Sequence, residues 1–380
     1  MSHIARKFLK FAIIGPPNGG KSLLTNQLVK AEVAAVSKRM DTTRCNLTAA
    51  YTEDNCQLVA VDSPGLVGIQ HATSKSVGKE LTILTDPEKA MKNAEHVLVV
   101  QDATHTGDYI HHRVLYLLNR YNHIPASLVI NKVDLIEDRS QLLPLVKILT
   151  DNQVDGKKIN TKRVTFGKLG KIADDKIISE TRDGIPLYQK NKFSMNEMDE
   201  KWKTSYRIVM NKPYDKCSWA ETKKLFTQFR GWPYFKSVFF VSSLTGEGIG
   251  NLRDYLVNQA TPGKWMYEEN TLTTKNPKDI VLDQIKAECL NHLPSEAGYG
   301  IKLRLMDWSF NDERLNIIVE LICDKKRWAK LLIQNNPSRI AYMEDSVNNI
   351  IQNLINQPLF IKLLVKYNGQ TVTEDNYQKL

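Results

Sequence analysis

Short apolar runs alternate with longer helical segments through the first half of the chain. The runs are rich in β-branched and aromatic residues, and they lie at Phe11–Gly15, Cys56–Asp62, His96–Ala103, Ala126–Lys132 and Ser237–Ser243. Continuous apolar runs of this kind are typical of parallel strands that are buried on both faces. Because helical patterns separate most of them, we expect a doubly wound α/β domain with a mostly parallel sheet over residues 1–260, closed by a helix at Ile249–Gln259.

A second pattern follows Thr261-Pro262-Gly263, which has the composition of a linker. Residues 264–380 alternate between helical and strand periodicities and predict a smaller α+β domain. The expected helices are Pro277–His292, Lys325–Ile333 and Arg339–Ile355, and the expected strands are Tyr299–Met306, Leu315–Cys323 and Leu359–Val365.

Residues 151–230 interrupt the α/β alternation. This insert holds 18 Lys and Arg and 11 Asp and Glu, a net charge of +7, and it lacks a strong run of periodic apolar positions. A long insert without regular structure is usually either functional or disordered. Two interpretations stay open: a solvated, disordered segment, or a basic arm that contacts RNA.

Composition narrows the class of protein. The chain is 42% hydrophobic and 25% charged, with a net charge of +10 that favours an acidic partner. No apolar run reaches the roughly 18–20 residues that a transmembrane helix needs. The five cysteines are scattered without a C-x-x-C pair, which indicates a reducing compartment rather than a disulfide framework or a zinc site. The basic N-terminal segment is too short for a convincing presequence.

A phosphate-binding motif follows the first apolar run. The residues Gly15-Pro16-Pro17-Asn18-Gly19-Gly20-Lys21-Ser22 fit the pattern G-x-x-x-x-G-K-[ST] between a predicted strand and a helix. Glycines let backbone N–H groups approach phosphate oxygens, and the helix N-terminus favours an anion. We expect Lys21 to reach the β- and γ-phosphates and Ser22 to bind Mg²⁺.

Two further segments predict a magnesium and γ-phosphate site. Asp62-Ser63-Pro64-Gly65 ends the second apolar run, so Asp62 is expected to hold Mg²⁺ and the Gly65 N–H to sense the γ-phosphate. Between the two motifs lies Asp41-Thr42-Thr43-Arg44. A threonine there can close over Mg²⁺ and release on hydrolysis, and we expect this residue to be Thr43, with Thr42 as the alternative.

The nucleotide base is predicted from Asn131-Lys132-Val133-Asp134, which ends the fourth run. The carboxylate of Asp134 can accept hydrogen bonds from both N1–H and N2–H₂ of guanine, a donor pair that adenine lacks, so GTP is favoured over ATP. We expect Lys132 to lie along the base and Asn131 to tie this loop to the phosphate loop. Ser242, Ser243 and Leu244 end the fifth run, where backbone N–H groups can contact guanine O6.

Together these motifs resemble the Era family of GTPases. The family couples a GTPase domain to a C-terminal type II KH domain, a small RNA-binding module, and the pattern over 264–380 is similar to it. The segments GWPYFKSVFFVSS, PGKWMYEENTLTTKNP and LFIKLLVKY resemble the mitochondrial branch in particular. The resemblance implies a GTPase that binds small-subunit ribosomal RNA and assists assembly of the small ribosomal subunit.

The resemblance also implies a setting and a catalytic peculiarity. We expect a monomer in the mitochondrial matrix, with the cytoplasm as the alternative compartment, and a peripheral contact with the inner membrane is left open. Leu66 stands where other GTPases carry a catalytic glutamine, so hydrolysis is expected to be slow. In related GTPases an asparagine at the position of Asn18 coordinates K⁺, and we carry that role to Asn18 as a hypothesis. Gly19 stands where the family usually has valine.

The KH-like module departs from the family at its RNA-binding loop. The tetrapeptide aligned with G-x-x-G is Gln334-Asn335-Asn336-Pro337, so neither glycine is present. The segment 261–380 balances 15 Lys and Arg against 15 Asp and Glu. The basic residues that flank the loop are candidates for phosphate contacts, namely Lys325, Lys326, Arg327, Lys330 and Arg339. The alternative is a GTP-dependent protein-interaction switch whose KH-like module no longer binds RNA.

Overall fold

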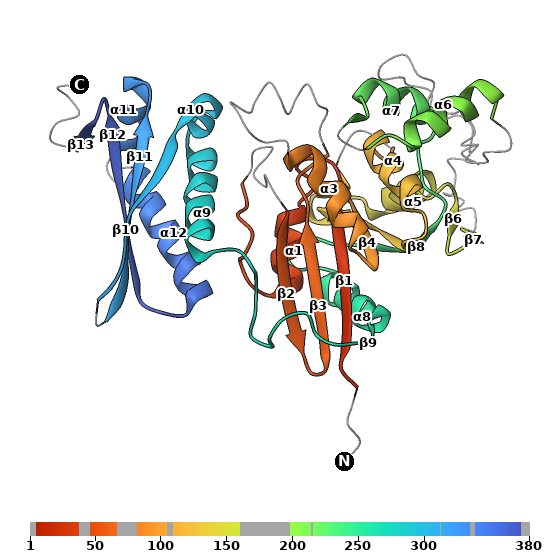
Figure 1. The fold of residues 1–380 in the computed structure, drawn as a ribbon, viewed down its shortest axis with the longest axis horizontal. Coiled ribbons are helices and arrows are strands. Elements are labelled where there is room, and N and C mark those ends of the chain that lie inside the picture. The colour runs from red at the N-terminus through yellow and green to blue at the C-terminus, as the bar shows by residue number, and fades with distance from the viewer. Residues whose placement is uncertain are drawn as a thin grey trace, which may run out of the picture. The chain divides into compact units, whose positions relative to one another are not determined.

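The computed structural model describes residues 5–37, 46–66, 82–104, 109–159, 198–213, 216–311, 313–334 and 339–373 (Figure 1). Three predicted features lie outside these ranges. They are the switch threonines Thr42 and Thr43, the central part of the basic insert at 160–197, and the residues Asn335–Pro337 of the degenerate loop. In the described part of the chain, no helix is both long and apolar enough to cross a lipid bilayer.

A mostly parallel sheet forms from the apolar runs. Its seven described strands run in the order β2-β3-β1-β4-β5-β8, and β9 pairs with β1. Parallel pairing joins β1 (Lys7–Ile14) to β4 (His96–Asp102), β4 to β5 (Ala126–Asn131), and β5 to β8 (Phe235–Phe240). Buried strands of this kind need apolar residues on both faces, and all seven residues of β3 (Cys56–Asp62) are buried.

Two antiparallel strands were not predicted. β2 (Leu47–Glu53) pairs with β3 in a hairpin, and β9 (Thr261–Pro262) pairs with Lys7 and Phe8 of β1. The segment Thr261–Gly263, predicted to be a plain linker, therefore begins as a short strand. Its pairing depends on a partner more than 250 residues away in the sequence, which local composition does not reveal.

The helices of this first part mostly follow the sequence periodicity. They are α1 (Lys21–Val29), α3 (Thr82–Lys92), α4 (His112–Arg120), α5 (Leu142–Leu149) and α8 (Ile249–Gln259). The last one has the predicted bounds. α1 begins at the lysine of the phosphate-binding motif, so the glycine-rich turn leads straight from β1 into a helix N-terminus.

The prediction that the insert lacks regular structure is wrong for its two ends. Residues 151–159 hold a short hairpin of β6 (Gln153–Val154) and β7 (Lys157–Lys158), and residues 198–230 hold two helices, α6 (Glu200–Met210) and α7 (Trp219–Phe226). α7 packs on α4 and on α6 (Figure 1). These helices bury scattered aromatic side chains, Phe226 and Phe229 among them, rather than a periodic aliphatic stripe.

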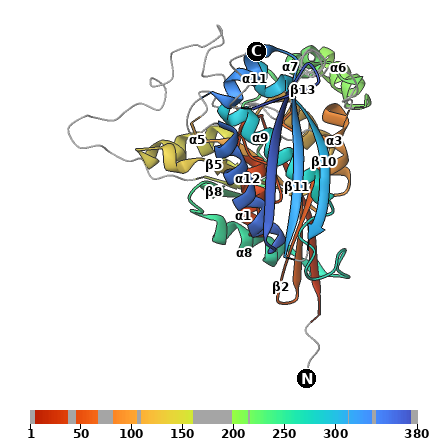
Figure 2. The same ribbon diagram turned by 90° about the vertical axis from the view of Figure 1, so that its left-hand side faces the viewer.

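The C-terminal module is a four-stranded sheet covered by helices on one side. The strand order is β10-β11-β12-β13, with β11 (Arg314–Cys323) parallel to β12 (Leu359–Tyr367) and antiparallel to β10 (Lys302–Asn311). α9 (Pro277–His292), α11 (Lys326–Ile333) and α12 (Arg339–Ile355) lie on one face, and Figure 2 shows the sheet from the other. β13 (Gln370–Val372) completes the sheet.

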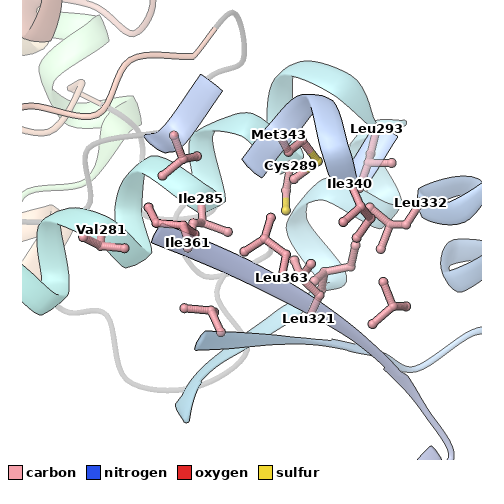
Figure 3. Packing of buried hydrophobic residues seen from close by; sticks show 14 of the residues in the cluster. Val281, Ile285, Cys289, Leu293, Leu321, Leu332, Ile340, Met343, Ile361 and Leu363 are labelled. Atoms are coloured by element: carbon pink, nitrogen blue, oxygen red, sulfur yellow. The ribbon is translucent and has the colours of Figure 1, made fainter. Parts of the chain in front are cut away.

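The hydrophobic core of this module accounts for the alternation of apolar and polar residues along its strands. Alternate residues of β11 and β12 point toward the helices, where Ile361 and Leu363 meet Ile285 and Met343 (Figure 3). The predicted start of the first strand is wrong. Tyr299 and Gly300, expected to begin that strand, belong instead to α10 (Ser295–Gly300). A side chain at Gly300 would collide with the buried Trp328 ring at 2.3 Å, so the helix end lies close against α11.

The chain divides into two compact units. One comprises residues 1–9, 21–64 and 256–380, and the other comprises residues 10–20 and 65–255. The candidate nucleotide-site residues accordingly fall into one cluster in each unit.

Candidate nucleotide-binding site

The first cluster lies at the start of α1 and the end of β3. The Ser22 Oγ donates a 2.7 Å hydrogen bond to Asp62 Oδ2, and both Lys21 and Asp62 are buried. The motif residues that the sequence separates by 40 positions therefore meet. A hydroxyl beside a carboxylate is an oxygen donor pair of the kind that Mg²⁺ prefers.

Asp62 carries an unused acceptor in this cluster. Its side chain is fully buried, and its Oδ1 has no hydrogen-bond partner among the described residues. Burial raises the pKa of Asp62 to about 6, although the charge of Lys21 and the hydrogen bond from Ser22 favour the ionised form. A buried carboxylate oxygen without a donor costs free energy unless a cation binds it, so Ser22 and Asp62 could hold a divalent metal ion.

The glycine-rich turn belongs to the second cluster. A side chain at Gly15 would meet the Val100 carbonyl oxygen at 2.4 Å, and Gly20 has a positive φ of 85° that favours glycine. These contacts explain two of the motif glycines, because the turn must pass close to β4. Asn18 is exposed and adopts a left-handed φ of 60° at the tip of the turn.

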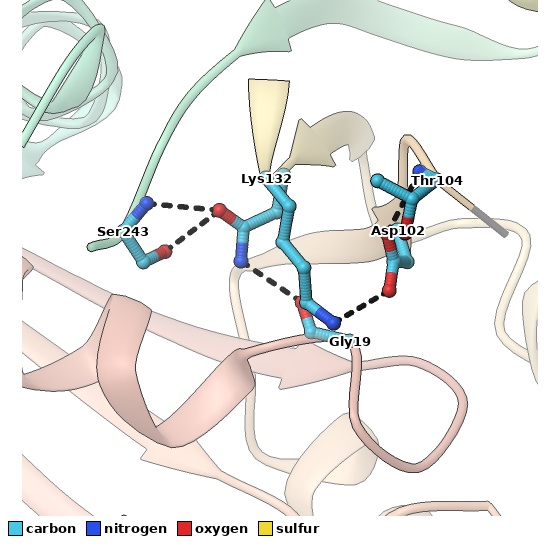
Figure 4. Close-up of polar contacts among 6 residues, drawn as sticks. Gly19, Asp102, Thr104, Lys132 and Ser243 are labelled. Carbon is cyan, nitrogen blue, oxygen red and sulfur yellow. Dashed lines mark hydrogen bonds and ion pairs between the residues drawn. The ribbon is translucent and has the colours of Figure 1, made fainter. Parts of the chain in front are cut away.

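Asn131 joins this turn to the last loop of the sheet. Its Nδ2 donates to the Gly19 carbonyl at 2.9 Å, and its Oδ1 accepts two 2.9 Å hydrogen bonds from the N–H and the hydroxyl of Ser243 (Figure 4). Asn131, Ser242 and Ser243 are all buried. The predicted tie between the N-K-x-D loop and the phosphate loop is therefore present, and it reaches Ser243 as well.

Lys132 has a partner that the sequence motifs do not indicate. Its Nζ donates a 2.6 Å hydrogen bond to Asp102 Oδ2 at the end of β4, and Asp102 Oδ1 accepts from the N–H and hydroxyl of Thr104 (Figure 4). Burial alone would raise the pKa of Asp102, but the hydrogen bonds from Lys132 and Thr104 outweigh it and leave the pKa below its ordinary value. Asp102 is thus a charged anchor for Lys132.

Asp134 and Leu244 are exposed at the loops where a nucleotide base is expected to bind. Asp134 lies in the 3₁₀ turn η1 (Val133–Leu135) and is exposed, and the Leu244 side chain is 72% exposed. A bidentate pair joins Arg139 to Glu247, at 2.5 and 2.9 Å, and so connects the segment after η1 to the segment after Leu244. No motif marked Arg139 or Glu247, because each is an ordinary surface charge until the fold brings them together.

The segment after β3 reaches the glycine-rich turn through its backbone. The Leu66 N–H donates to the Gly15 carbonyl at 3.2 Å, and the Leu66 side chain is only 2% exposed. In the neighbouring Ser63-Pro64-Gly65 segment, Ser63 and Pro64 are buried and Gly65 is half-buried. An alkyl side chain buried in this way has no group that could orient a water molecule.

The basic residues proposed for RNA contact are partly engaged in the C-terminal module. Lys325 and Arg327 both form ion pairs with Glu296, and Arg339 Nη1 donates to the Leu331 carbonyl at 2.7 Å. Lys326 is exposed and Lys330 is half-buried. The structure therefore gives three of these five residues partners within the protein.

Comparisons with known proteins agree with this arrangement. The family described as 50S ribosome-binding GTPase matches residues 10–132. The "GTPase Era, mitochondrial" of Caenorhabditis elegans is 42% identical over 377 residues, covering 97% of this chain and 92% of that protein. The protein of the same name from Danio rerio is 30% identical over 363 residues, covering 95% and 75%.

Solved structures share the fold. Aquifex aeolicus Era bound to GDP and AlF₄⁻ superposes with a TM-score of 0.60 at 17% identity, covering 96% of this chain and 94% of that one. A complex of Era with MgGDPNP and nucleotides 1506–1542 of 16S ribosomal RNA has the same TM-score and identity, covering 98% and 96%. These two likenesses concern the fold alone. The relatives that align along almost the entire sequence carry the assignment: this chain belongs to the Era family of GTPases and is similar to its mitochondrial members.

Proposed function

We propose that this chain is a Mg²⁺-dependent, GTP-hydrolysing switch that binds small-subunit ribosomal RNA and assists assembly of the small ribosomal subunit in the mitochondrial matrix. The observation that supports nucleotide binding is the buried side chain of Asn131, which joins Gly19 of the phosphate loop to Ser243. This bridge ties the N-K-x-D loop to the loop that is proposed to hold the phosphates. A base and its phosphates need such a fixed spacing between their two binding loops.

Each motif residue has a role in this proposal. The N–H groups of residues 15–20 and the Lys21 ammonium bind phosphate oxygens, and Asp134 accepts from N1–H and N2–H₂ of guanine. Ser22 and Asp62 would hold Mg²⁺, and Thr43 would close over it in the GTP state. A bound magnesium ion would offset negative charge on the β- and γ-phosphates. The Gly65 N–H senses the γ-phosphate.

Hydrolysis in this proposal is slow and depends on a monovalent cation. Leu66 offers no polar atom to a water molecule, so another group must stabilise the charge that develops on the phosphates. Asn18 is exposed in the phosphate loop, and its side-chain oxygen could be one ligand of a K⁺ ion. Turnover should therefore rise when KCl replaces NaCl at equal ionic strength, and equal rates in both salts would argue against this role.

The proposed ribosomal role and mitochondrial location rest on the similarity to known Era proteins. Proteins that align over nearly all of this chain are named mitochondrial Era, and one solved Era binds a fragment of 16S ribosomal RNA. The alternative, a protein-interaction switch without RNA, draws support from the ion pairs that occupy Lys325 and Arg327. Crosslinking the protein in mitochondrial extracts and sequencing the attached RNA decides between the two.

Base recognition is tested by comparing GTP, ITP and ATP in fluorescence titrations with Mg²⁺. ITP lacks the 2-amino group, so it should bind more weakly than GTP in the wild-type protein, and Asp134→Asn should remove that difference. Lys21→Ala should abolish binding of all three nucleotides. Equal wild-type affinity for ATP and GTP would contradict the proposal.

A further inference from the structure

The described exposed positions of α7 and of the turn before it include lysines and no acidic residue. Exposed positions recur with helical spacing at Lys216, Trp219, Ala220, Lys223, Lys224 and Thr227, whereas Thr222, Leu225 and Phe226 are buried on the opposite side. The acid between them, Glu221, turns back to cap the helix: its carboxylate accepts from the Ser218 N–H and pairs with Lys212.

The cations of this surface are available for an outside partner. Lys216, Lys223 and Lys224 form no ion pair with any residue that the structure describes. Two of the basic residues proposed for RNA contact in the C-terminal module differ, because Lys325 and Arg327 are already paired with Glu296. Binding a phosphate costs no existing ion pair at Lys223 or Lys224, whereas it would break one at Lys325.

An exposed tryptophan lies among these lysines. Trp219 is 41% exposed, Lys223 Nζ lies 4.7 Å from the centre of its ring, and the His112 ring meets it edge-on at 4.8 Å and 86°. His112 is itself held by a 2.9 Å hydrogen bond between its Nδ1 and Thr222 Oγ1. The indole is therefore supported on one side and open to solvent on another, as a platform for stacking requires.

The platform is firmly attached to the α/β domain. Tyr116 Oη donates to the Lys212 carbonyl at 2.9 Å, and Arg120 Nη1 donates to the Met210 carbonyl at 2.7 Å, both just before α7. Trp202 Nε1 of α6 donates to the Leu225 carbonyl of α7 at 3.0 Å. A ligand that binds α7 therefore binds a surface whose geometry is set before contact, which lowers the entropy lost on binding.

We propose that this face of α7 is a binding surface for single-stranded RNA, with a base stacked on Trp219 and phosphates on Lys216, Lys223 and Lys224. Sequence-tolerant single-strand binding uses this combination of aromatic ring and basic side chains. The inference rests on the proposed RNA-binding function and names a surface for it outside the KH-like module. Among the described residues, the exposed lysines of this surface have no acidic partner, which favours a polyanion over a protein helix.

The test measures affinity for a fluorescein-labelled RNA oligonucleotide with the 3′-terminal sequence of small-subunit rRNA, using full-length protein. Trp219→Ala should weaken binding about tenfold, and Trp219→Phe should restore most of it. The double variant Lys223→Glu/Lys224→Glu should weaken binding further and reduce the slope of log affinity against log salt by about 1.4. GTP affinity and melting temperature should stay at wild-type values in the lysine variant.

The hairpin β6–β7 supplies a matched control. Lys157 and Lys158 are also adjacent, exposed lysines in the same insert, and Lys157→Glu/Lys158→Glu should leave RNA affinity close to the wild-type value. Equal losses in the two double variants would overturn the assignment by showing a general charge effect. Unchanged affinity in the α7 variants would also overturn it, while leaving RNA binding intact.

Two further measurements complete the test. One separates failure of this surface from failure of the proposed RNA-binding function, and the other separates an RNA partner from a lipid partner. If the wild-type protein itself fails to bind the oligonucleotide, the RNA part of the proposed function fails along with this surface. Cosedimentation with cardiolipin-containing vesicles tests a membrane partner of the same charge. Loss of vesicle binding in the α7 variants with RNA affinity unchanged would assign the surface to lipid instead and contradict the proposal.

Discussion

The Nε of Arg120 on α4 lies 3.0 Å from the Oε1 of Glu88 on α3. The same guanidinium donates through Nη1 to the carbonyls of Met210 and Lys212, at 2.7 and 2.5 Å, at the end of α6. Tyr121 Oη also donates to Glu88, at 2.7 Å. One arginine thus connects the helix that follows the D-S-P-G segment to the helical end of the insert.

Replacing Arg120 by alanine should loosen the α6–α7 pair. Both partners are mostly buried, with 22% and 11% of their side chains exposed, so the change leaves the Glu88 carboxylate without its cation. It also removes the donor to the Met210 carbonyl, whereas Tyr121 still donates to Glu88 and Tyr116 still donates to the Lys212 carbonyl. Losing one partner of a buried pair costs about 3–5 kcal/mol. We expect a lower melting temperature and faster hydrogen exchange across residues 200–226, read by mass spectrometry. Lys236→Ala, which removes a pair with Asp155 in which both side chains are about half exposed, is the control and should change little.

Removing the charge of Asp102 should weaken nucleotide binding without changing base preference. Asp102→Asn keeps the contacts with Thr104 but loses the charge that holds Lys132, so the ammonium is less well positioned along the base. A hydrogen bond to a charged group is worth about 1.5–3 kcal/mol, which corresponds to a loss of roughly 10-fold or more in GTP and GDP affinity. The ratio of GTP to ATP affinity should persist, because Asp134 sets it; a collapse of that ratio would assign base selection partly to Asp102.

The conformation of the segment after β9 should depend on hydrogen bonds to the Gln57 side chain. This side chain is fully buried; its Oε1 accepts from the N–H groups of Met266 and Tyr267, at 2.9 and 3.0 Å, and its Nε2 donates to the Tyr267 carbonyl. Gln57→Ala leaves these backbone groups without a partner, at a cost of about 1–3 kcal/mol. Limited proteolysis should cut the variant faster within residues 264–273, whereas the exposed Gln141→Ala should be cut like the wild type. Identical cleavage of both variants would show that β9 and neighbouring contacts hold the segment alone.

Buried histidines should make the fold sensitive to mild acid. Burial lowers the pKa of His96 from 6.5 to about 4, and burial together with His111, Arg113 and Lys223 lowers that of His112 to about 3. The unfolded chain then binds protons below pH 6.5 while the folded chain does not, so stability falls as the pH drops from 6.5 toward 4. Each histidine costs about 1.4 kcal/mol per pH unit in that range.

The histidine effect is measured by urea unfolding at about pH 7.5 and about pH 5.5, on either side of the ordinary histidine pKa. His96→Asn has no imidazole to protonate, so its stability should fall less between the two pH values than that of the wild type. This comparison uses the change with pH, so a general loss of stability in the variant does not obscure it. Equal changes in both proteins would show that His96 is not responsible.

Local chemistry made much of this protein predictable from its sequence. The phosphate loop, Asp62 and Asn131 are recognisable because phosphate, Mg²⁺ and guanine each demand particular groups at particular strand ends. The bounds of α8, α9 and α12 follow from periodicity, because these helices pack one apolar side against a sheet. The sequence pattern also indicated the α+β order of the C-terminal module.

Other features depend on residues that meet only in the folded chain. Asp102 gains its connection to Lys132 because β4 and β5 pair in parallel, and Arg139 meets Glu247 across a separation of 108 residues. α6 and α7 escaped prediction because they are stabilised by aromatic side chains and by hydrogen bonds from Tyr116 and Arg120, not by an aliphatic period. The chemical groups and their order are properties of the chain before it folds. Which of these groups become neighbours depends on how distant strands and helices pack, and no short stretch of sequence contains that information.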